Sequence, residues 1–161
     1  MEIENAAYRL LESEIVEITD ETEISSIETA VNSGIETIKT HLQKSIELIS
    51  DRKNPDLRNS IKESISAVES ACQKLSGKKN SSLGDCLKEL KGKNPLHPAF
   101  EKALVSLYGY TSDEGGIRHA LSEESVDPSY ADAKFMLVSC SAFINYLLTK
   151  ASELNLPIKT T

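Results

Sequence analysis

The chain has 161 residues, enough for one domain with a buried core, and 39% of them are hydrophobic while 27% are charged. The net charge is −7, and residues 1–50 carry eleven acidic against three basic residues, which opposes nonspecific binding to nucleic acid. The sequence starts without the basic residues and apolar run of a signal peptide, and nothing in it approaches a membrane span in length. We therefore expect a cytoplasmic protein without a membrane partner.

Three cysteines, Cys72, Cys86 and Cys140, are spread along the chain without clustering. Their spacing matches no zinc motif, and their odd number does not suit a disulfide framework. Cys72 and Cys140 fall on apolar helix stripes, so we expect buried core thiols in a reducing compartment. The sequence accordingly predicts no metal site and no cofactor.

Hydrophobic periodicity predicts an all-α bundle of five or six helices behind a short N-terminal β-hairpin. Residues that favour strands place the hairpin within 1–20. Thr19 or Asp20 is expected to cap the first helix. The whole chain, 1–161, is predicted to form a single domain, with the helical bundle in residues 21–155.

The clearest predicted helix follows Asn54, the expected cap, with Pro55 in its first position and Gly77 at its end. Small residues on this helix would allow a neighbouring helix to approach closely. Its apolar stripe consists of Leu57, Ile61, Ile65, Val68, Cys72 and Leu75. This pattern predicts a central helix of the bundle.

Further helices are predicted at residues 83–90, at 98–108 and in a last long segment that ends near Asn155. The last helix is apolar on several sides, so it is expected to be the most buried element and to face a second copy in a homodimer. The residues that do not fit one narrow stripe are Phe135, Met136, Leu137, Phe143, Ile144, Tyr146, Leu147 and Leu148.

The stretch GYTSDEGGIRHAL, residues 109–121, gathers the side chains best suited to chemistry. Gly115 and Gly116 free the backbone for a tight turn, and its amide groups could meet an anion. Lys78 and Lys79 belong to a locally basic segment that could add positive charge beside this turn. These four residues are candidate phosphate-binding groups.

Arg118 and His119 are the candidate catalytic residues of the same stretch. A guanidinium grips phosphate with two parallel donors, and an imidazole exchanges protons near neutral pH. Asp113 or Glu114 is positioned to orient the imidazole or to pair with the arginine. Together these groups suit phosphodiester cleavage by a 2′-hydroxyl. A purely structural interpretation remains open, in which Arg118 pairs with an acid and His119 donates to a carbonyl at a helix connection.

The phrases NPDLRNSIKESISAVES, LYGYTSDEGGIRHAL and AKFMLVSCSAFINYLL occur in this order along the chain. Their arrangement resembles the AbiJ-like domains of bacterial abortive infection, which belong to the HEPN superfamily (higher eukaryotes and prokaryotes nucleotide-binding). The resemblance spans roughly residues 8–155. It implies an up-and-down helical bundle that usually dimerises. Many such domains are metal-independent ribonucleases in phage defence, and others bind nucleotides or scaffold partners without catalysis.

The catalytic motif of that superfamily is an arginine, usually followed by a polar residue, with a histidine a few residues further on. If His119 is the histidine, the arginine position falls within residues 112–114, none of which is basic. If Arg118 is the arginine, the histidine is expected within residues 123–125, where there is none. The motif is therefore degenerate in this chain.

The resemblance implies an antiviral-defence domain that is an RNA-directed effector with a degenerate motif. The alternative is a non-catalytic dimerisation or nucleotide-sensing module. Whether the chain is an enzyme is left open, and an active form would be a metal-independent endoribonuclease. The expected partners are a second copy of the chain, RNA or a nucleotide, and a protein of the same defence system.

Overall fold

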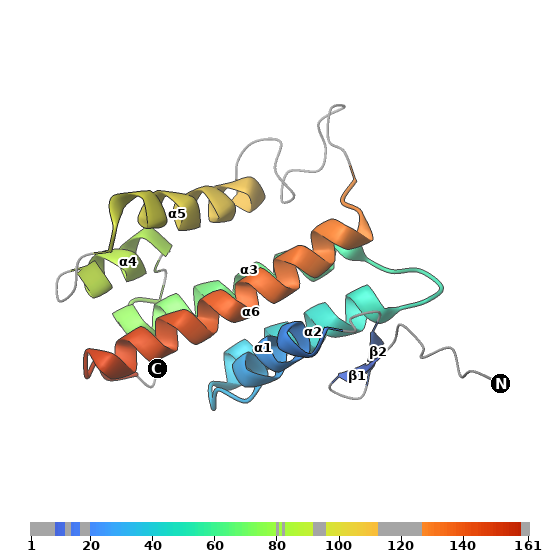
Figure 1. Ribbon diagram of the computed structural model, residues 1–161, viewed down its shortest axis with the longest axis horizontal. Helices are drawn as coiled ribbons and strands as arrows, with labels where there is room; N and C mark the ends of the chain where they lie inside the picture. Colours follow the sequence, from blue (N-terminus) through green and yellow to red (C-terminus); the bar gives the residue numbers. More distant parts are fainter. Residues whose placement is uncertain are drawn as a thin grey trace.

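The structure is a computed structural model, and it describes residues 9–11, 14–16, 20–79, 81, 83–91, 96–112 and 127–158. It confirms the all-α helical bundle, with six helices and two three-residue strands in that part of the chain (Figure 1). In chain order the elements are β1 (Arg9–Leu11), β2 (Glu14–Val16), α1 (Glu21–Val31), α2 (Glu36–Ser50), α3 (Leu57–Ser76), α4 (Leu83–Lys91), α5 (Pro98–Ser112) and α6 (Tyr130–Glu153).

The strands β1 and β2 form an antiparallel pair in which Arg9 lies opposite Val16. This pair lies beside α2, at the end of the molecule away from α4 and α5 (Figure 1). The four long segments α1, α2, α3 and α6 lie side by side, and α4 and α5 cover one side of the α3–α6 pair (Figure 1). The hydrophobic core therefore sits between the four long helices.

The first helix starts at the residue expected from the sequence. The carboxylate of Asp20 accepts hydrogen bonds from the backbone N–H groups of Thr22, at 2.9 Å, and Glu23, at 3.0 Å, so Asp20 is the cap. The helix ends at Val31, and Gly34 then turns the chain towards α2 with a φ of 81°. Glycine adopts this left-handed conformation without the steric cost that a side chain would add.

Helix α3 is the centre of the bundle, as predicted, because eleven of its twenty residues are buried. Its start differs from the prediction: Asp56 rather than Asn54 caps the helix. The Asp56 carboxylate accepts a hydrogen bond of 3.0 Å from the backbone N–H of Asn59, and the helix begins after it. Gly77, with a φ of 70°, ends α3 where the sequence indicated.

Helices α2 and α3 pack antiparallel through a small polar contact inside the core. The buried hydroxyl of Ser45 lies 2.9 Å from the hydroxyl of Ser60 and 2.8 Å from that of Ser64. Small side chains let the two helix backbones come close, and each buried hydroxyl has a hydrogen-bond partner. The close approach expected from the small residues of α3 is therefore made by α2.

Helix α6 runs parallel to α3. Near the first turns of both helices, the Arg58 guanidinium binds the carboxylate of Asp127 at 2.9 Å. Eight of the twenty-four residues of α6 are buried, against eleven of twenty in α3, so the expectation that the last helix is the most buried element is wrong. The reason is that one flank of α6 lies at the edge of the bundle, where Phe135 is 59% exposed.

By length and composition alone, α6 is long and apolar enough to cross a membrane. The sequence-based statement that no segment has the length of a membrane span is corrected on this point. The core helix of a water-soluble bundle has the same composition, and the buried side of α6 packs against α1 and α3. The apolar character of α6 therefore does not indicate a membrane.

Because α3 and α6 run in the same direction, the chain must travel back along the bundle after α3 ends and before α6 begins. Helices α4 and α5 lie on this return path. Helix α4 buries Leu83, Cys86, Leu87 and Leu90. Helix α5 has no fully buried side chain from Pro98 to Gly109, and three of its side chains are partly buried against the core. Helix α5 therefore contacts the core through one row of partly buried side chains, Leu104, Leu107 and Tyr108.

Candidate functional site

Most of the site predicted from the sequence lies outside the described residues: Asp113, Glu114, Gly115, Gly116, Arg118 and His119. Lys78 and Lys79 are described, and both are exposed directly after α3. Asp127 follows the segment 113–126 and binds Arg58 at the opposite end of α3, which is about 30 Å long. The two lysines and the described C-terminal flank of that segment therefore lie at opposite ends of α3.

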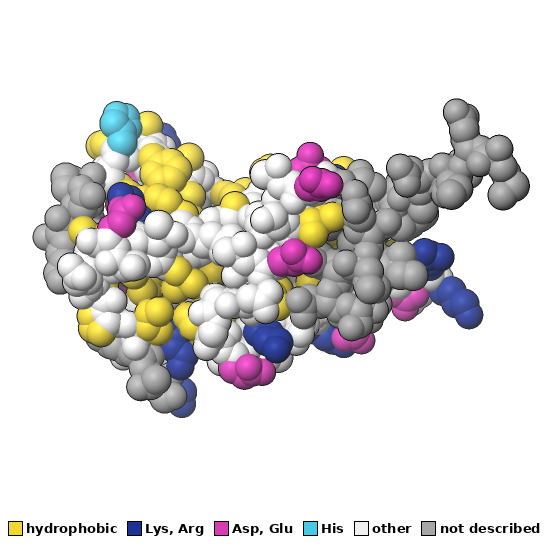
Figure 2. Space-filling model, turned by 60° about the horizontal axis from the view of Figure 1, so that its bottom comes forward, with side chains coloured by type: hydrophobic (Ala, Val, Ile, Leu, Met, Phe, Trp, Pro, Cys, Tyr) yellow, Lys and Arg dark blue, Asp and Glu magenta, His cyan; other side chains and the backbone are white. Residues whose placement is uncertain are grey.

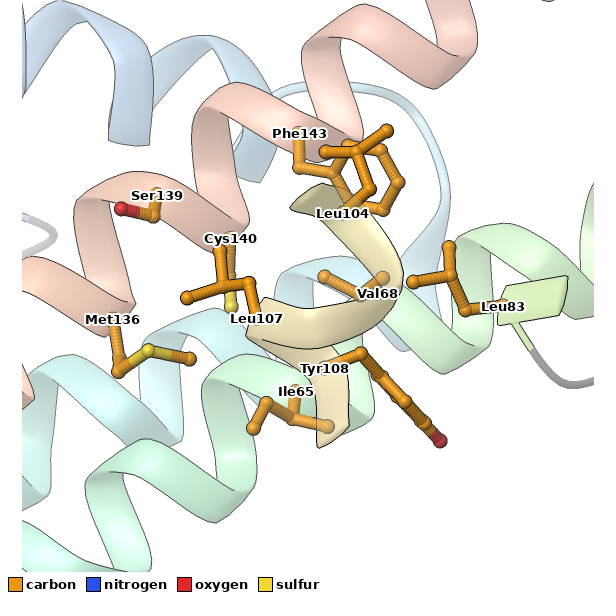
Figure 3. A pocket seen from close by; sticks show the side chains of 10 residues that line it. All are labelled: Ile65, Val68, Leu83, Leu104, Leu107, Tyr108, Met136, Ser139, Cys140 and Phe143. Carbon is orange, nitrogen blue, oxygen red and sulfur yellow. The ribbon is translucent and has the colours of Figure 1, made fainter. Parts of the chain in front are cut away.

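A hydrophobic pocket lies beneath α5, where four helices meet (Figure 3). Leu104, Leu107 and Tyr108 of α5 line it from one side, and α3, α4 and α6 supply the rest (Figure 3). Its volume of about 20 Å³ is close to that of one water molecule. The other lining residues are Ile65, Val68, Leu83, Met136, Ser139, Cys140 and Phe143.

Tyr108 and Cys140 bring two polar groups to this pocket. The Tyr108 hydroxyl donates a hydrogen bond to the Glu69 carboxylate, which ties α5 to α3. Burial raises the pKa of the Cys140 thiol to about 12, so this thiol stays protonated at neutral pH. A protonated thiol is a weak nucleophile. The pocket therefore resembles a small gap in the packing between helices.

Apolar side chains of α5 and α6 lie beside this pocket, and some of them line it. We call Phe100, Leu107, Phe135, Phe143 and Tyr146 the α5–α6 face. The ring of Tyr146 packs edge-on against Phe100, with centroids 5.5 Å apart, and stacks on Phe143 at 6.3 Å. Phe100 is 43% exposed although it takes part in this cluster. The space-filling view shows hydrophobic side chains gathered at the end that carries α4 and α5 (Figure 2).

The α5–α6 face is also poor in charge. Residues 135–149 of α6 contain no charged side chain, and Glu101 and Lys102 are the only charged residues of α5. Depletion of charge together with exposed aromatic rings is typical of the core of a protein–protein interface. The sequence pointed to the α6 residues of this face, but not to Phe100 and Leu107. The low charge of α5 was the signal that could have identified them.

Two histidines outside the predicted site have structural contacts. The Nδ1 atom of His41 lies 2.7 Å from a carboxylate oxygen of Glu63, which joins α2 to α3. The Nδ1 atom of His97 accepts a hydrogen bond of 3.2 Å from the backbone N–H of Ala99 at the start of α5. Among the described residues, no group of three or more His, Cys, Asp or Glu side chains is arranged to hold a metal ion.

The structure brings together two cysteines that the sequence suggested were separate. Interaction with Cys86 on α4, together with burial, raises the pKa of the Cys72 thiol on α3 well above its usual range, and both side chains are fully buried. Their spacing gave no signal, because the two residues meet only when α4 folds back onto α3.

The chain was compared with protein-family models, with curated proteins and with solved structures, and nothing matched in any of the three comparisons.

Proposed function

We propose that this chain is a HEPN-like helical domain that acts as a dimerisation module by self-association through the α5–α6 face. The observation that carries the proposal is the exposure of the large apolar side chains Phe100 on α5 and Phe135 on α6, both beside stretches with little or no charge. Single exposed apolar residues are common, but a cluster of them beside an uncharged helix surface is typical of an association site. This proposal takes the non-catalytic alternative of the sequence resemblance as the leading function.

A second copy suits this face for electrostatic reasons. Each copy carries a net charge of −7, so two copies repel each other unless they meet where charge is absent. The low charge of the face therefore lets two like-charged copies meet without bringing many charges of the same sign together.

The contribution of Phe135 can be worked out from its exposure. An aromatic side chain buries about 150–250 Å² when fully covered, so covering the exposed 59% of Phe135 removes about 90–150 Å² from water. At about 25 cal/mol per Å², this is worth about 2–4 kcal/mol for each copy. Phe135→Ser should therefore weaken the dimer by at least about tenfold.

Sedimentation equilibrium over a wide concentration range tests this proposal. We expect a dimer for the wild type, a shift towards monomer for Phe135→Ser, and no shift for Ile158→Ser. Ile158 is a suitable control because it is also exposed, at 48%, but lies after α6. A wild-type protein that stays monomeric throughout would contradict the proposal, and so would equal effects of the two variants.

The second candidate function is an RNA-directed effector of bacterial antiviral defence, with Arg118 and His119 as its catalytic residues and Asp113 and Glu114 as their partners. It is supported by the stretch GYTSDEGGIRHAL and by the resemblance to AbiJ-like domains. In this function the domain is a metal-independent endoribonuclease in the cytoplasm. Its expected partners are RNA or a nucleotide and a regulatory protein of the same system.

Cleavage of mixed RNA in the presence of a chelator tests this second function. We expect His119→Ala to abolish cleavage at an unchanged melting temperature, and Arg118→Lys to reduce it, because lysine lacks the bidentate donor pair. If His119→Ala instead lowers the melting temperature and the wild type cleaves no RNA, the stretch is a structural connection. That result would leave the dimerisation proposal intact.

A further inference from the structure

A polar cleft lies where the C-terminal end of α1 packs against the last turns of α6. Its volume of about 540 Å³ is within the range of clefts that hold small molecules, about 300–1,000 Å³. Seven of its eight lining residues are polar, and several of them, such as Thr149 and Ser152, are exposed at its mouth. Small-molecule pockets usually have a mostly apolar lining, so this lining favours a polar ligand.

The lining side chains of this cleft offer hydrogen-bond acceptors more than donors. The amide nitrogens of Asn32 and Asn145 and the hydroxyl of Thr29 each donate a hydrogen bond to a backbone carbonyl oxygen of α1, at 2.9, 2.8 and 2.7 Å respectively. Because these donors are directed at the helix backbone, the oxygen atom of each side chain is the group that remains to accept a hydrogen bond. A ligand that matches such a lining must itself be rich in donors.

Ser33 supplies an independent sign that the cleft binds a polar molecule. This residue lines the cleft, and its hydroxyl oxygen is buried without a hydrogen-bond partner among the described residues. Buried hydroxyl groups in folded proteins nearly always have a partner, so each exception calls for an explanation. A bound molecule with N–H donors would satisfy this oxygen.

The electrostatics of the cleft favour positive charge. The C-terminal end of a helix carries a partial negative charge, and the last turn of α1 contains no basic residue to offset it. Glu153 is the only charged residue among the described residues that line the cleft. Lys150 binds Oε2 of Glu153 at 2.7 Å, and a carboxylate can accept further hydrogen bonds through its two oxygens.

We propose that this cleft binds a small organic cation of the polyamine class. A protonated primary amine carries three N–H donors and no acceptor, which matches the acceptor-rich lining and the charge of Glu153. The apolar stem that joins two ammonium groups matches Leu148, the one apolar residue of the lining. Such a site goes beyond both proposed functions, because none of its residues belongs to the α5–α6 face or to the segment 113–126.

Isothermal titration with a matched pair of dications tests the chemistry. The ligands are 1,6-diaminohexane and hexamethonium, which have the same chain length and the same charge, but the quaternary nitrogens of hexamethonium have no N–H donors. The titrations use the full chain at about 0.15 M salt, where the Debye length is about 8 Å. We expect saturable binding of one diamine per chain. Hexamethonium should bind at least about tenfold more weakly, the equivalent of losing about one charge-assisted hydrogen bond.

Two glutamine variants test the location of the site. Glu153→Gln should weaken diamine binding at least about tenfold, because the ligand loses its countercharge. Glu47→Gln should leave binding unchanged. Glu47 is a matched control: it pairs with Lys44 three residues before it, as Glu153 does with Lys150, and the two glutamates are similarly exposed, at 57% and 54%.

Ser33→Ala separates a binding role of this hydroxyl from a structural one. Because the hydroxyl is buried without a partner, its removal should not lower the melting temperature of the ligand-free protein, although it should weaken diamine binding. Equal binding of hexamethonium, equal losses in the two glutamine variants, or no saturable binding at millimolar diamine would overturn the proposal. Each of these results can be obtained whether or not the α5–α6 face forms a dimer and whether or not the chain cleaves RNA.

Discussion

Truncation of Ile65 to alanine tests whether the bundle is built around α3 as described. Ile65 lies in the middle of α3, is 2% exposed, and lines the pocket beneath α5. Its side chain therefore fills the space between the central helix and the excursion formed by α4 and α5. Removing it enlarges an existing small cavity rather than opening a surface groove.

The expected loss of stability has two parts. Alanine lacks three carbon atoms of isoleucine, and at about 0.8 kcal/mol for each buried carbon the transfer part is about 2.4 kcal/mol. The enlarged cavity adds a further part that depends on how far the neighbours move in, and measured totals are about 2–5 kcal/mol. Because α5 is only partly packed, we expect partial collapse and a total of about 3 kcal/mol. For a chain of this length the melting temperature should fall by about 6–12 °C.

Thermal and urea unfolding followed by circular dichroism measure this loss. Ile65→Val should cost about 0.5–1.5 kcal/mol, so the two variants form a graded series. Lys102→Ala, at an exposed position of α5, should stay within about 0.5 kcal/mol of the wild type. If Ile65→Ala melted within a degree of the wild type, the packing of α3 against α6 would be wrong.

Three further predictions concern single local contacts. Ser129→Ala should cost about 1 kcal/mol, because the Ser129 hydroxyl and Asp132 form a capping box at the start of α6. Hydrogen bonds from the Ser129 hydroxyl and backbone N–H lower the pKa of Asp132. The stability that the Asp132 carboxylate contributes is therefore present above about pH 3.9, the pKa of an unfolded aspartate, and is lost as the pH falls through its lower folded pKa. The free energies of unfolding of the wild type and of Ser129→Ala, measured by urea titration, should therefore converge in acid. Gly34→Ala should cost about 1–2 kcal/mol through its φ of 81° alone, since no atom within 4 Å would meet the new methyl group; unchanged stability would contradict this conformation. His41→Ala should cost no more than about 1 kcal/mol, because the contact with Glu63 is about one-third exposed, and a larger loss by thermal melting would indicate a role beyond this pair.

The fold could be predicted from the sequence where one short-range signal sufficed. The stripe from Ile61 to Leu75 fixed the buried side of α3, and the αL conformation of Gly77 ended the helix where a glycine was expected. The cap of α3 was misplaced by two residues. Asn54, Pro55 and Asp56 are all common near a helix start, and the choice between them depended on one hydrogen bond to Asn59.

Tertiary relations were harder to predict because no local pattern encodes them. The α5–α6 face depends on which flank of α6 is covered by α4 and α5. For the candidate site, the sequence identified residue types suited to phosphate chemistry. Their arrangement lies outside the described residues, so Arg118 and His119 remain a prediction.

The packing of α6, the last helix, against α1, the first, has a consequence for synthesis on the ribosome. Asn145 of α6 donates a hydrogen bond of 2.8 Å to the carbonyl oxygen of Ser26 in α1, and 119 positions separate the two residues. At about 5–20 residues per second, α1 would wait about 6–24 s for its partner to be translated. During that interval the apolar side of α1, including Ile27, has α2 beside it but lacks α6. Slow translation of the α4–α5 excursion would therefore prolong the period in which the nascent bundle is open to aggregation or to chaperones.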